Sequence, residues 1–276
     1  MLPKPKGLTN VGIIQFFLAL SFVIWLLIFP DKGSLFAWPV TPLLTAMFIG
    51  TSFILRTILG FRLWRERYWY RLRWSMWGNY AFLAVILLAT FWHVDDLNWK
   101  SDIIVAHIWV IAYIVEPLML PLLEPRGPDS RQPLPAELSR GPILNGLKNT
   151  LVAIYITTFA IAGLLVIHPA FMDTRWPWPL DPFNARVMAA WPAACAAWAL
   201  TMYFSKDWAE IKPGVQMLLV YAAALFAVWL FTFPGYDHTR ANGITFGVFT
   251  GIIAVLLAYF YWRQESQQPQ PGNSSP

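Results

Sequence analysis

The sequence predicts an all-α membrane protein, a polytopic bundle of eight transmembrane helices arranged as two parallel four-helix repeats. The chain is 57% hydrophobic and only 13% charged, whereas about a quarter of the residues in soluble domains are charged. Its apolar residues fall in eight runs, each close to the roughly 20 residues that a helix needs to cross a bilayer. A Trp-Pro-x-x-Pro motif occurs twice, at Trp38 and 140 positions later at Trp178.

The eight runs predict helices because they lack strand-like alternation, and a chain in lipid satisfies its backbone only as a helix or in a closed barrel. The first run follows Lys4 and Lys6, as in a signal peptide, but no small-residue cleavage site ends it, so we expect a retained helix. Pro117 and Pro192 are expected to kink the fourth and sixth helices. The predicted spans are Val11–Phe29, Thr41–Gly60, Ser75–Trp92, Asp102–Leu123, Lys148–His168, Phe183–Phe204, Gly214–Phe233 and Asn242–Trp262.

The two motifs belong to a longer internal repeat. Arg67-Tyr68-Trp69 after the second run resembles Lys206-Asp207-Trp208 after the sixth, and residues 91–96 resemble residues 233–238. A period of this length indicates a duplicated domain. The predicted organisation is a first four-helix repeat at 11–123, a Pro/Arg/Gly-rich cytoplasmic linker at 124–147, a second four-helix repeat at 148–262 and a disordered Gln/Pro/Ser-rich tail at 263–276.

The basic residues predict the orientation in the cell (inner, cytoplasmic) membrane. If the N-terminus is cytoplasmic, fourteen Lys and Arg residues fall in cytoplasmic segments and four in outer loops. This bias favours a cytoplasmic N-terminus and a cytoplasmic C-terminus. Each half has an even number of spans, so a pseudo-two-fold axis along the membrane normal is expected to relate the halves. Because the basic residues lie in short loops between apolar runs, the expected partner is the lipid bilayer and not nucleic acid.

Two charged residues, Arg56 and Glu116, lie inside predicted spans at similar depth. An intramembrane carboxylate is costly and is expected to face protein and find a partner, which predicts a buried Arg56–Glu116 pair. Two alternatives remain open: Arg56 snorkels toward the surface, or Glu116 is protonated and hydrogen-bonded. The pair has no counterpart in the second half, where the positions 140 residues later are Ala196 and Leu256.

A polar cluster is predicted at the outer face, where helix ends carry histidine and aspartate. Imidazole and carboxylate groups bind zinc, manganese or iron, and any metal is expected on His93, His238, Asp95 and Asp237. A proton-responsive gate is an alternative because histidine titrates near neutral pH, and simple solvation of helix ends is another. The cluster comprises His93, Asp95, Asp96, His107, Asp237 and His238.

The small-residue ridge Gly243, Gly247 and Gly251 lies on one face of the eighth predicted helix. Such spacing lets helix backbones approach closely. It predicts packing within the chain or, alternatively, the interface of a homodimer or larger membrane complex. The chain has no Gly-rich phosphate loop, Cys-x-x-Cys, Gly-x-Ser-x-Gly or His-Glu-x-x-His motif, so no catalytic residue is predicted, and the cofactor stays unknown.

Three functions remain open at this point. The duplication and the intramembrane charges favour binding or transport of a small solute or ion at the repeat interface. The abundant aromatics and the glycine ridge favour a non-catalytic accessory subunit of a larger, energy-converting membrane complex. The outer His/Asp cluster alone supports a membrane enzyme.

The chain resembles a group of uncharacterised bacterial eight-helix membrane proteins. The resemblance is carried by the doubled Trp-Pro-x-x-Pro signature, by the two loops with a basic residue and a Trp (67–69 and 206–208, the basic-Trp loops) and by the His93-x-Asp95 sequence. The resemblance spans most of Val11–Trp262. It implies the same eight-helix architecture and carries no known activity.

The charge bias generates a labelling prediction. In a Cys195→Ala background, a membrane-impermeant thiol reagent added from outside is expected to label Ser34→Cys and Asn98→Cys but not Ser130→Cys, because the first two lie in predicted outer loops and the third in the predicted cytoplasmic linker. Labelling is measured by mass shift on intact cells, with lysed cells as the control for reactivity. Labelling of Ser130→Cys in intact cells contradicts the orientation.

Overall fold

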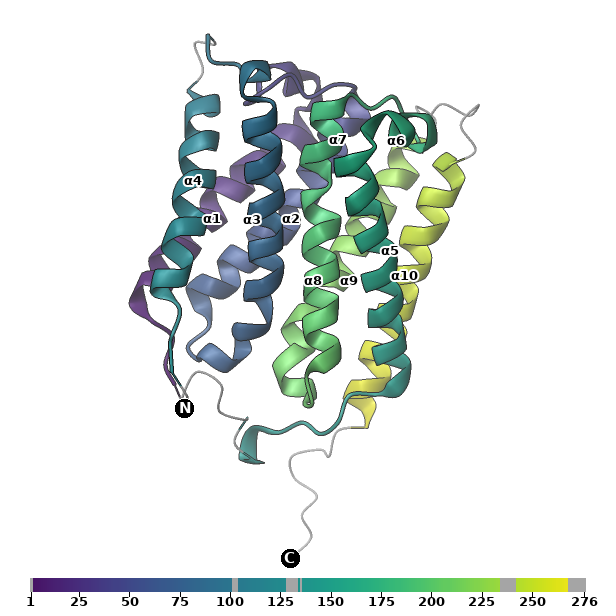
Figure 1. Cartoon of the computed structure of the whole chain (residues 1–276). Coiled ribbons are helices and arrows are strands. Elements are labelled where there is room, and N and C mark those ends of the chain that lie inside the picture. The colour runs from purple at the N-terminus through teal and green to yellow at the C-terminus, as the bar shows by residue number, and fades with distance from the viewer. Residues whose placement is uncertain (1, 101–103, 128–133, 135, 234–241, 268–276) are drawn as a thin grey trace, which may run out of the picture.

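The computed structural model describes residues 2–100, 104–127, 134, 136–233 and 242–267, and it is an all-helical bundle (Figure 1). Eight helical segments are long and apolar enough to cross a membrane, which confirms the predicted fold class. They are α1 with a π-helical last turn (Lys6–Ile28), α2 (Leu43–Arg65), α3 (Arg73–Trp92), α4 (Val105–Leu123), α5 (Asn145–Ile167), α7 with α8 (Pro182–Phe204), α9 (Trp208–Thr232) and α10 (Asn242–Ser266).

The start of α1 and the end of α10 lie at the same end of the bundle, which we call the terminal end (Figure 1). The short helix α6 (Pro169–Arg175) lies at the opposite end. Ser34 and Asn98, the two labelling positions expected in outer loops, contact each other, since the Asn98 side-chain amide donates to the Ser34 carbonyl oxygen at 3.1 Å.

Several boundaries differ from the prediction. The sixth span is two helices, α7 (Pro182–Met188) and α8 (Ala190–Phe204), because Pro192 has no N–H to donate to the Met188 carbonyl. Helix α9 begins at Trp208, six residues before the predicted Gly214, where Asp207 caps it by accepting from the Ala209 N–H at 2.8 Å. Helix α10 continues to Ser266, so the predicted tail begins too early. Residues 268–276 of that tail lie outside the described residues.

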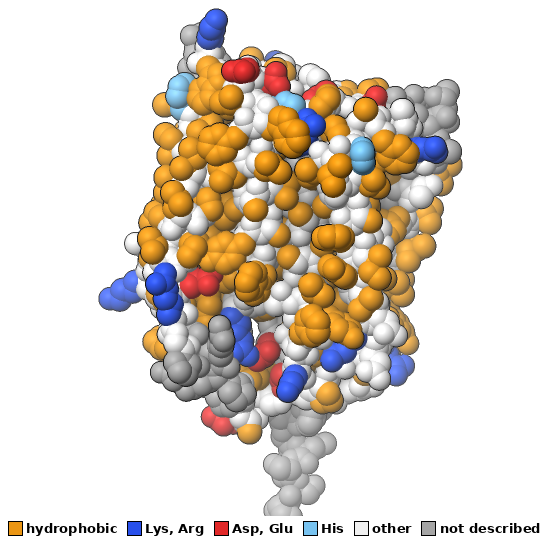
Figure 2. All heavy atoms as spheres, in the orientation of Figure 1, with side chains coloured by type: hydrophobic (Ala, Val, Ile, Leu, Met, Phe, Trp, Pro, Cys, Tyr) orange, Lys and Arg blue, Asp and Glu red, His pale blue; other side chains and the backbone are white. Residues whose placement is uncertain are grey.

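The helices form an inner and an outer set. The inner set is α2, α3 and α7/α8, in which 67%, 56% and 61% of the central residues are buried inside the bundle. The outer set includes α1, α4 and α5, with 28% each, and α10, with 22%. The outer set therefore leaves large apolar side chains exposed. On the face shown in Figure 2 they cover the middle of the molecule, and charged side chains gather toward its two ends. This distribution matches a surface that faces lipid between two aqueous sides.

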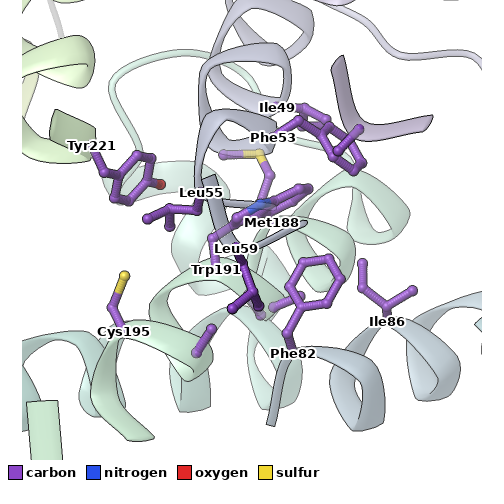
Figure 3. Packing of buried hydrophobic residues seen from close by; sticks show 14 of the residues in the cluster. Ile49, Phe53, Leu55, Leu59, Phe82, Ile86, Met188, Trp191, Cys195 and Tyr221 are labelled. Atoms are coloured by element: carbon purple, nitrogen blue, oxygen red, sulfur yellow. The ribbon is translucent and has the colours of Figure 1, made fainter. Parts of the chain in front are cut away.

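Aromatic and aliphatic side chains fill the contact between the inner helices (Figure 3). Trp191 of α8 packs edge-on against Phe53 of α2 and Phe82 of α3, with ring centroids 5.3 and 5.5 Å apart. Lipid tails are as apolar as these side chains, so close packing and hydrogen bonds, not removal from water, hold such helices together.

The helix pairing is the one that the predicted two-fold axis would produce. Within each half the first helix packs on the second and the third on the fourth, as α1 on α2, α3 on α4, α5 on α8 and α9 on α10. Between the halves α2 packs on α9 and α3 on α8, and an axis that equates the halves would exchange these two contacts. The pairing supports the duplication, and superposition of the two halves stays a prediction.

The repeated motifs make reciprocal hydrogen bonds between the halves. The indole N–H of Trp38 donates to Asn184 Oδ1 of α7 at 2.8 Å. The indole N–H of Trp178 donates to Thr45 Oγ1 of α2 at 2.8 Å. Each motif thus bonds to the start of the helix that follows the other motif, and both bonds are buried.

The basic-Trp loops also play equivalent parts in the two halves. The backbone N–H of Trp69 donates to the Leu2 carbonyl at 3.2 Å, and that of Trp208 donates to the Gly141 carbonyl at 3.0 Å. Each loop therefore holds the segment that precedes the first helix of its own half. Lys4 adds contacts in the first half by donating to the last carbonyls of α2, including Trp64 at 3.0 Å.

The reciprocal bonds generate a stability prediction. Trp38→Phe and Trp178→Phe each leave a buried acceptor without its donor, which is expected to lower the free energy of unfolding by about 1–3 kcal/mol. Thermal unfolding of the purified protein in detergent measures the loss. Trp262→Phe is the control, because Trp262 is 63% exposed. Equal midpoints for the three variants would show that the indole bonds contribute nothing.

Candidate functional site

The structure brings Arg56 and Glu116 together in the first half of the bundle. One guanidinium nitrogen of Arg56, on α2, donates to both carboxylate oxygens of Glu116, on α4, at 2.7 and 2.6 Å. The Arg56 side chain is 3% exposed and that of Glu116 is 14% exposed. Arg56 therefore does not snorkel to the surface, and Glu116 has a cationic partner.

Three further side chains surround the Arg56 end of the pair. The other terminal nitrogen of Arg56 donates to the side-chain carbonyl of Asn79 on α3. The Phe82 ring lies beneath the guanidinium, 4.6 Å from its central carbon, where the face of an aromatic ring attracts a cation. The Gln15 amide of α1 donates to the Arg56 backbone carbonyl at 3.1 Å. Helices α1 to α4 thus all contribute to one buried polar site.

A cavity of about 510 Å³ lies beside this site, between α1 and α4. Arg56, Glu116, Gln15 and Asn10 are its polar lining residues. Apart from the Tyr113 hydroxyl, the remaining lining is apolar and includes Leu18, Phe22, Phe53, Ile108, Ala112 and Met119. Ile14 and Ile111, also in the lining, are 67% and 62% exposed, so the cavity opens sideways between the two outer helices.

The Gln15 side chain is incompletely hydrogen-bonded. It is 6% exposed, and its Oε1 has no hydrogen-bond partner among the described residues. Its Nε2 is held by the Arg56 carbonyl, which fixes the orientation of the amide. A buried acceptor without a donor costs about 1–3 kcal/mol, so a hydrogen-bond donor that reached this atom would be favourable.

The outer-face cluster forms only in part. His93 Nδ1 lies 2.7 Å from Asp96 Oδ2, and His93 Nε2 lies 2.7 Å from a guanidinium nitrogen of Arg186. Because Arg186 can only donate, Nε2 accepts and the proton on Nδ1 is donated to Asp96. The His93 ring also stacks on Phe183 at 4.7 Å, and the guanidinium of Arg186 lies 4.2 Å from the Trp92 ring centre.

Two other predicted members of this cluster, His107 and Asp95, do not join that contact. His107 packs edge-on against Trp99 with centroids 5.2 Å apart, and Asp95 is exposed. Asp237 and His238 lie outside the described residues, so the predicted metal site shared by the two halves remains a prediction. Within the described ranges, no group of three or more His, Cys, Asp or Glu side chains could hold a metal ion.

The glycine ridge of α10 faces α9 of the same chain. A methyl group added at Gly247 would lie 2.1 Å from the Trp229 ring, and one added at Gly251 would lie 3.0 Å from the Phe226 ring. The Trp229 indole also donates to the Gly243 carbonyl at 2.8 Å. A dimer formed through these glycines would have to displace both rings, so the ridge serves packing within the chain here.

Comparison with known protein families, with curated protein sequences and with solved structures gave no match to this chain. Functional inference therefore rests on the site itself.

Sequence reasoning missed Asn79, Gln15 and Arg186. A single uncharged amide inside an apolar run gives little signal, because helix interfaces in membranes accommodate such groups. Arg186 gave a stronger signal, since it falls inside a predicted span, but its partner His93 is 93 residues earlier in the chain.

The geometry predicts strong coupling between Arg56 and Glu116. Glu116→Gln leaves a buried guanidinium without its counter-ion and is expected to lower the free energy of unfolding by about 3–5 kcal/mol. The double change Arg56→Gln/Glu116→Gln is expected to lower it by less than the sum of the two single changes. Unfolding in detergent of the four proteins of the double-mutant cycle measures this difference. Additive losses would show that the two residues act independently.

Proposed function

We propose that this integral membrane protein binds a lipid-soluble small molecule with a hydroxyl head group in the cavity between α1 and α4. The observation that carries the proposal is an apolar cavity, open between two outer helices, whose lining residues include Glu116 and Gln15, the latter with a buried Oε1 that has no partner among the described residues. The proposal places the binding site within the first half, not at the repeat interface.

The apolar lining supports a ligand that arrives from the bilayer. Binding pockets for small molecules are mostly apolar with a few polar groups that fix orientation, and 510 Å³ lies within their usual range of about 300–1,000 Å³. The exposed Ile14 and Ile111 lie where hydrocarbon chains would pass. A water-soluble ion would have to cross this apolar lining, so the cavity favours a hydrophobic ligand.

The polar groups support a head that donates hydrogen bonds. Gln15 Oε1 can only accept, and an ionised carboxylate such as that of Glu116 is also an acceptor with room for about four bonds. Arg56 donates to both carboxylate oxygens, and Asn79 approaches one of them at 3.5 Å, so acceptor capacity remains. An alcohol or phenol can donate its one O–H to either acceptor, whereas an ionised carboxylate head has no hydrogen to donate.

The contact between the halves supports binding more than passage. Side chains of α2, α3, α8 and α9 fill it, among them Phe53, Phe82 and Trp191. The buried Ser52 hydroxyl also bonds to the Tyr221 hydroxyl there at 2.8 Å. Transport, an accessory role in a larger complex and an outer-face enzyme activity stay predictions without a structural observation in their favour.

The proposed setting is the cell membrane with the terminal end in the cytoplasm. Several basic residues lie at the terminal end. Arg62 is in the last turn of α2, Arg71 is in the turn between α2 and α3, and Arg73 and Lys212 are in the first turns of α3 and α9. This position of the basic side chains agrees with the rule that cytoplasmic loops are enriched in Lys and Arg.

Photo-crosslinking tests the proposed ligand class. The purified protein in nanodiscs is irradiated with hexadecanol that carries a diazirine in its chain, and with the methyl ether of the same probe, which has no donor. Labelled peptides of α1 and α4 are expected with the alcohol. Gln15→Leu is expected to reduce the preference for alcohol over ether about fivefold, the equivalent of one hydrogen bond near 1 kcal/mol.

A matched pair of tryptophan substitutions provides the control. Ala112→Trp fills the cavity and is expected to abolish labelling of α1 and α4, while Ala223→Trp, at an exposed position of α9, is expected to leave it unchanged. Labelling spread evenly over all lipid-facing helices, or unaffected by Ala112→Trp, would contradict a specific site.

A further inference from the structure

A second cavity lies at the terminal end, between the two halves of the bundle. Its volume is about 280 Å³. It is formed by the end of α2, the turn before α3, the start of α9, the end of α10 and the segment before α5. The residues that line it are Arg62, Glu66, Arg71, Arg140, Ala209, Lys212, Pro213, Gln216 and Glu265.

Cationic side chains outnumber carboxylates in this lining. Arg62, Arg71, Arg140 and Lys212 carry four positive charges, and Glu66 and Glu265 carry two negative charges, so the lining has a net charge of 4 − 2 = +2. Like charges brought together repel, and the interaction grows as water is excluded. The two carboxylates reduce this repulsion without cancelling it.

The ion pairs show how the carboxylates are shared. Glu66 accepts from Arg62 at 3.0 Å and lies 3.6 Å from Arg71, so one carboxylate serves two guanidinium groups. Glu265 accepts from Lys212 at 2.6 Å. Gln216 fixes the second arm of Arg62, whose other nitrogen donates to the Gln216 side-chain oxygen at 2.8 Å.

Arg71 and Lys212 are accessible to a ligand from the aqueous side. Their side chains are 45% and 35% exposed, whereas the shared Glu66 is 12% exposed. Arg71 therefore reaches solvent more readily than Glu66, while Lys212 and its partner Glu265 are about equally exposed. The amide of Gln216 donates onward to the Tyr261 hydroxyl at 2.9 Å, so the cavity wall is fixed by contacts from both α9 and α10.

We propose that this cavity binds a phosphate group, with Arg71 and Lys212 as its direct ligands. Guanidinium groups match the tetrahedral phosphate oxygens in paired hydrogen bonds, and lysine supplies a point charge. The excess of two positive charges matches the charge of a phosphate monoester. Two sources share this chemistry: the head group of an anionic lipid at the membrane surface, and a phosphorylated solute in the adjoining aqueous phase.

Thermal unfolding of the full chain in detergent tests the site. One arm adds inorganic phosphate in place of chloride at constant ionic strength, and the other adds phosphatidic acid in place of phosphatidylcholine in mixed micelles. A rise of the midpoint with the first addition identifies a soluble phosphate, and a rise with the second alone identifies a lipid head group. Either result supports the proposal, and no rise in either arm overturns it.

Charge-matched variants separate a specific site from general attraction. Arg71→Gln/Lys212→Gln is expected to raise the half-saturating concentration at least about tenfold, the equivalent of one charged hydrogen bond. Arg65→Gln/Arg263→Gln removes the same charge from the ends of α2 and α10, outside the cavity lining. This control variant is expected to leave the half-saturating concentration unchanged. Equal effects of the two double variants overturn the proposal.

The single variant Arg71→Gln covers the case in which the first double variant does not fold. Arg62 retains its pair with Glu66 in that protein, so the cavity wall is expected to persist. An unchanged half-saturating concentration for Arg71→Gln would remove Arg71 from the site and overturn the assignment.

Discussion

The burial of the Arg56 guanidinium is the constraint on which the first half of the bundle depends. An ion moved from water to a protein interior costs several kcal/mol even after relaxation, and the bilayer offers no water to reduce that cost. The charge is therefore met by side chains from the neighbouring helices: Glu116 of α4, Asn79 of α3 and the Phe82 ring. Helix α4 is among the less buried spans, and this contact acts together with its buried Trp109, whose indole donates to Thr90 Oγ1 of α3 at 3.0 Å.

Composition and periodicity were enough to predict the eight spans, because lipid imposes one rule on every segment that crosses it. The ends of the helices were harder to predict, since they depend on local contacts such as the Asp207 cap of α9. The Arg56–Glu116 contact could be predicted from two charges at one depth, where the cost of leaving either alone is large. The cavity beside them could not, because its existence depends on the separation of α1 and α4, which no single residue specifies.

The two halves resemble each other in scaffold and differ in chemistry. The Trp-Pro-x-x-Pro motifs and the basic-Trp loops make equivalent contacts in both. The polar site has no such equivalence, since Ala196 and Leu256 stand where the second half would need a charge. Under the predicted duplication, one half would have acquired a site while the other half kept the packing that supports it.

The exchange of indole bonds between the motifs has a consequence for biosynthesis. The acceptor of Trp38 is made 146 residues after Trp38 itself, so the first four helices enter the membrane while that indole still lacks its partner. The Thr45 hydroxyl likewise has no indole donor until Trp178 is made, 133 residues later. Neither half can therefore complete its hydrogen bonding alone, and the fold is completed only after Asn184 has been made and the two halves dock together.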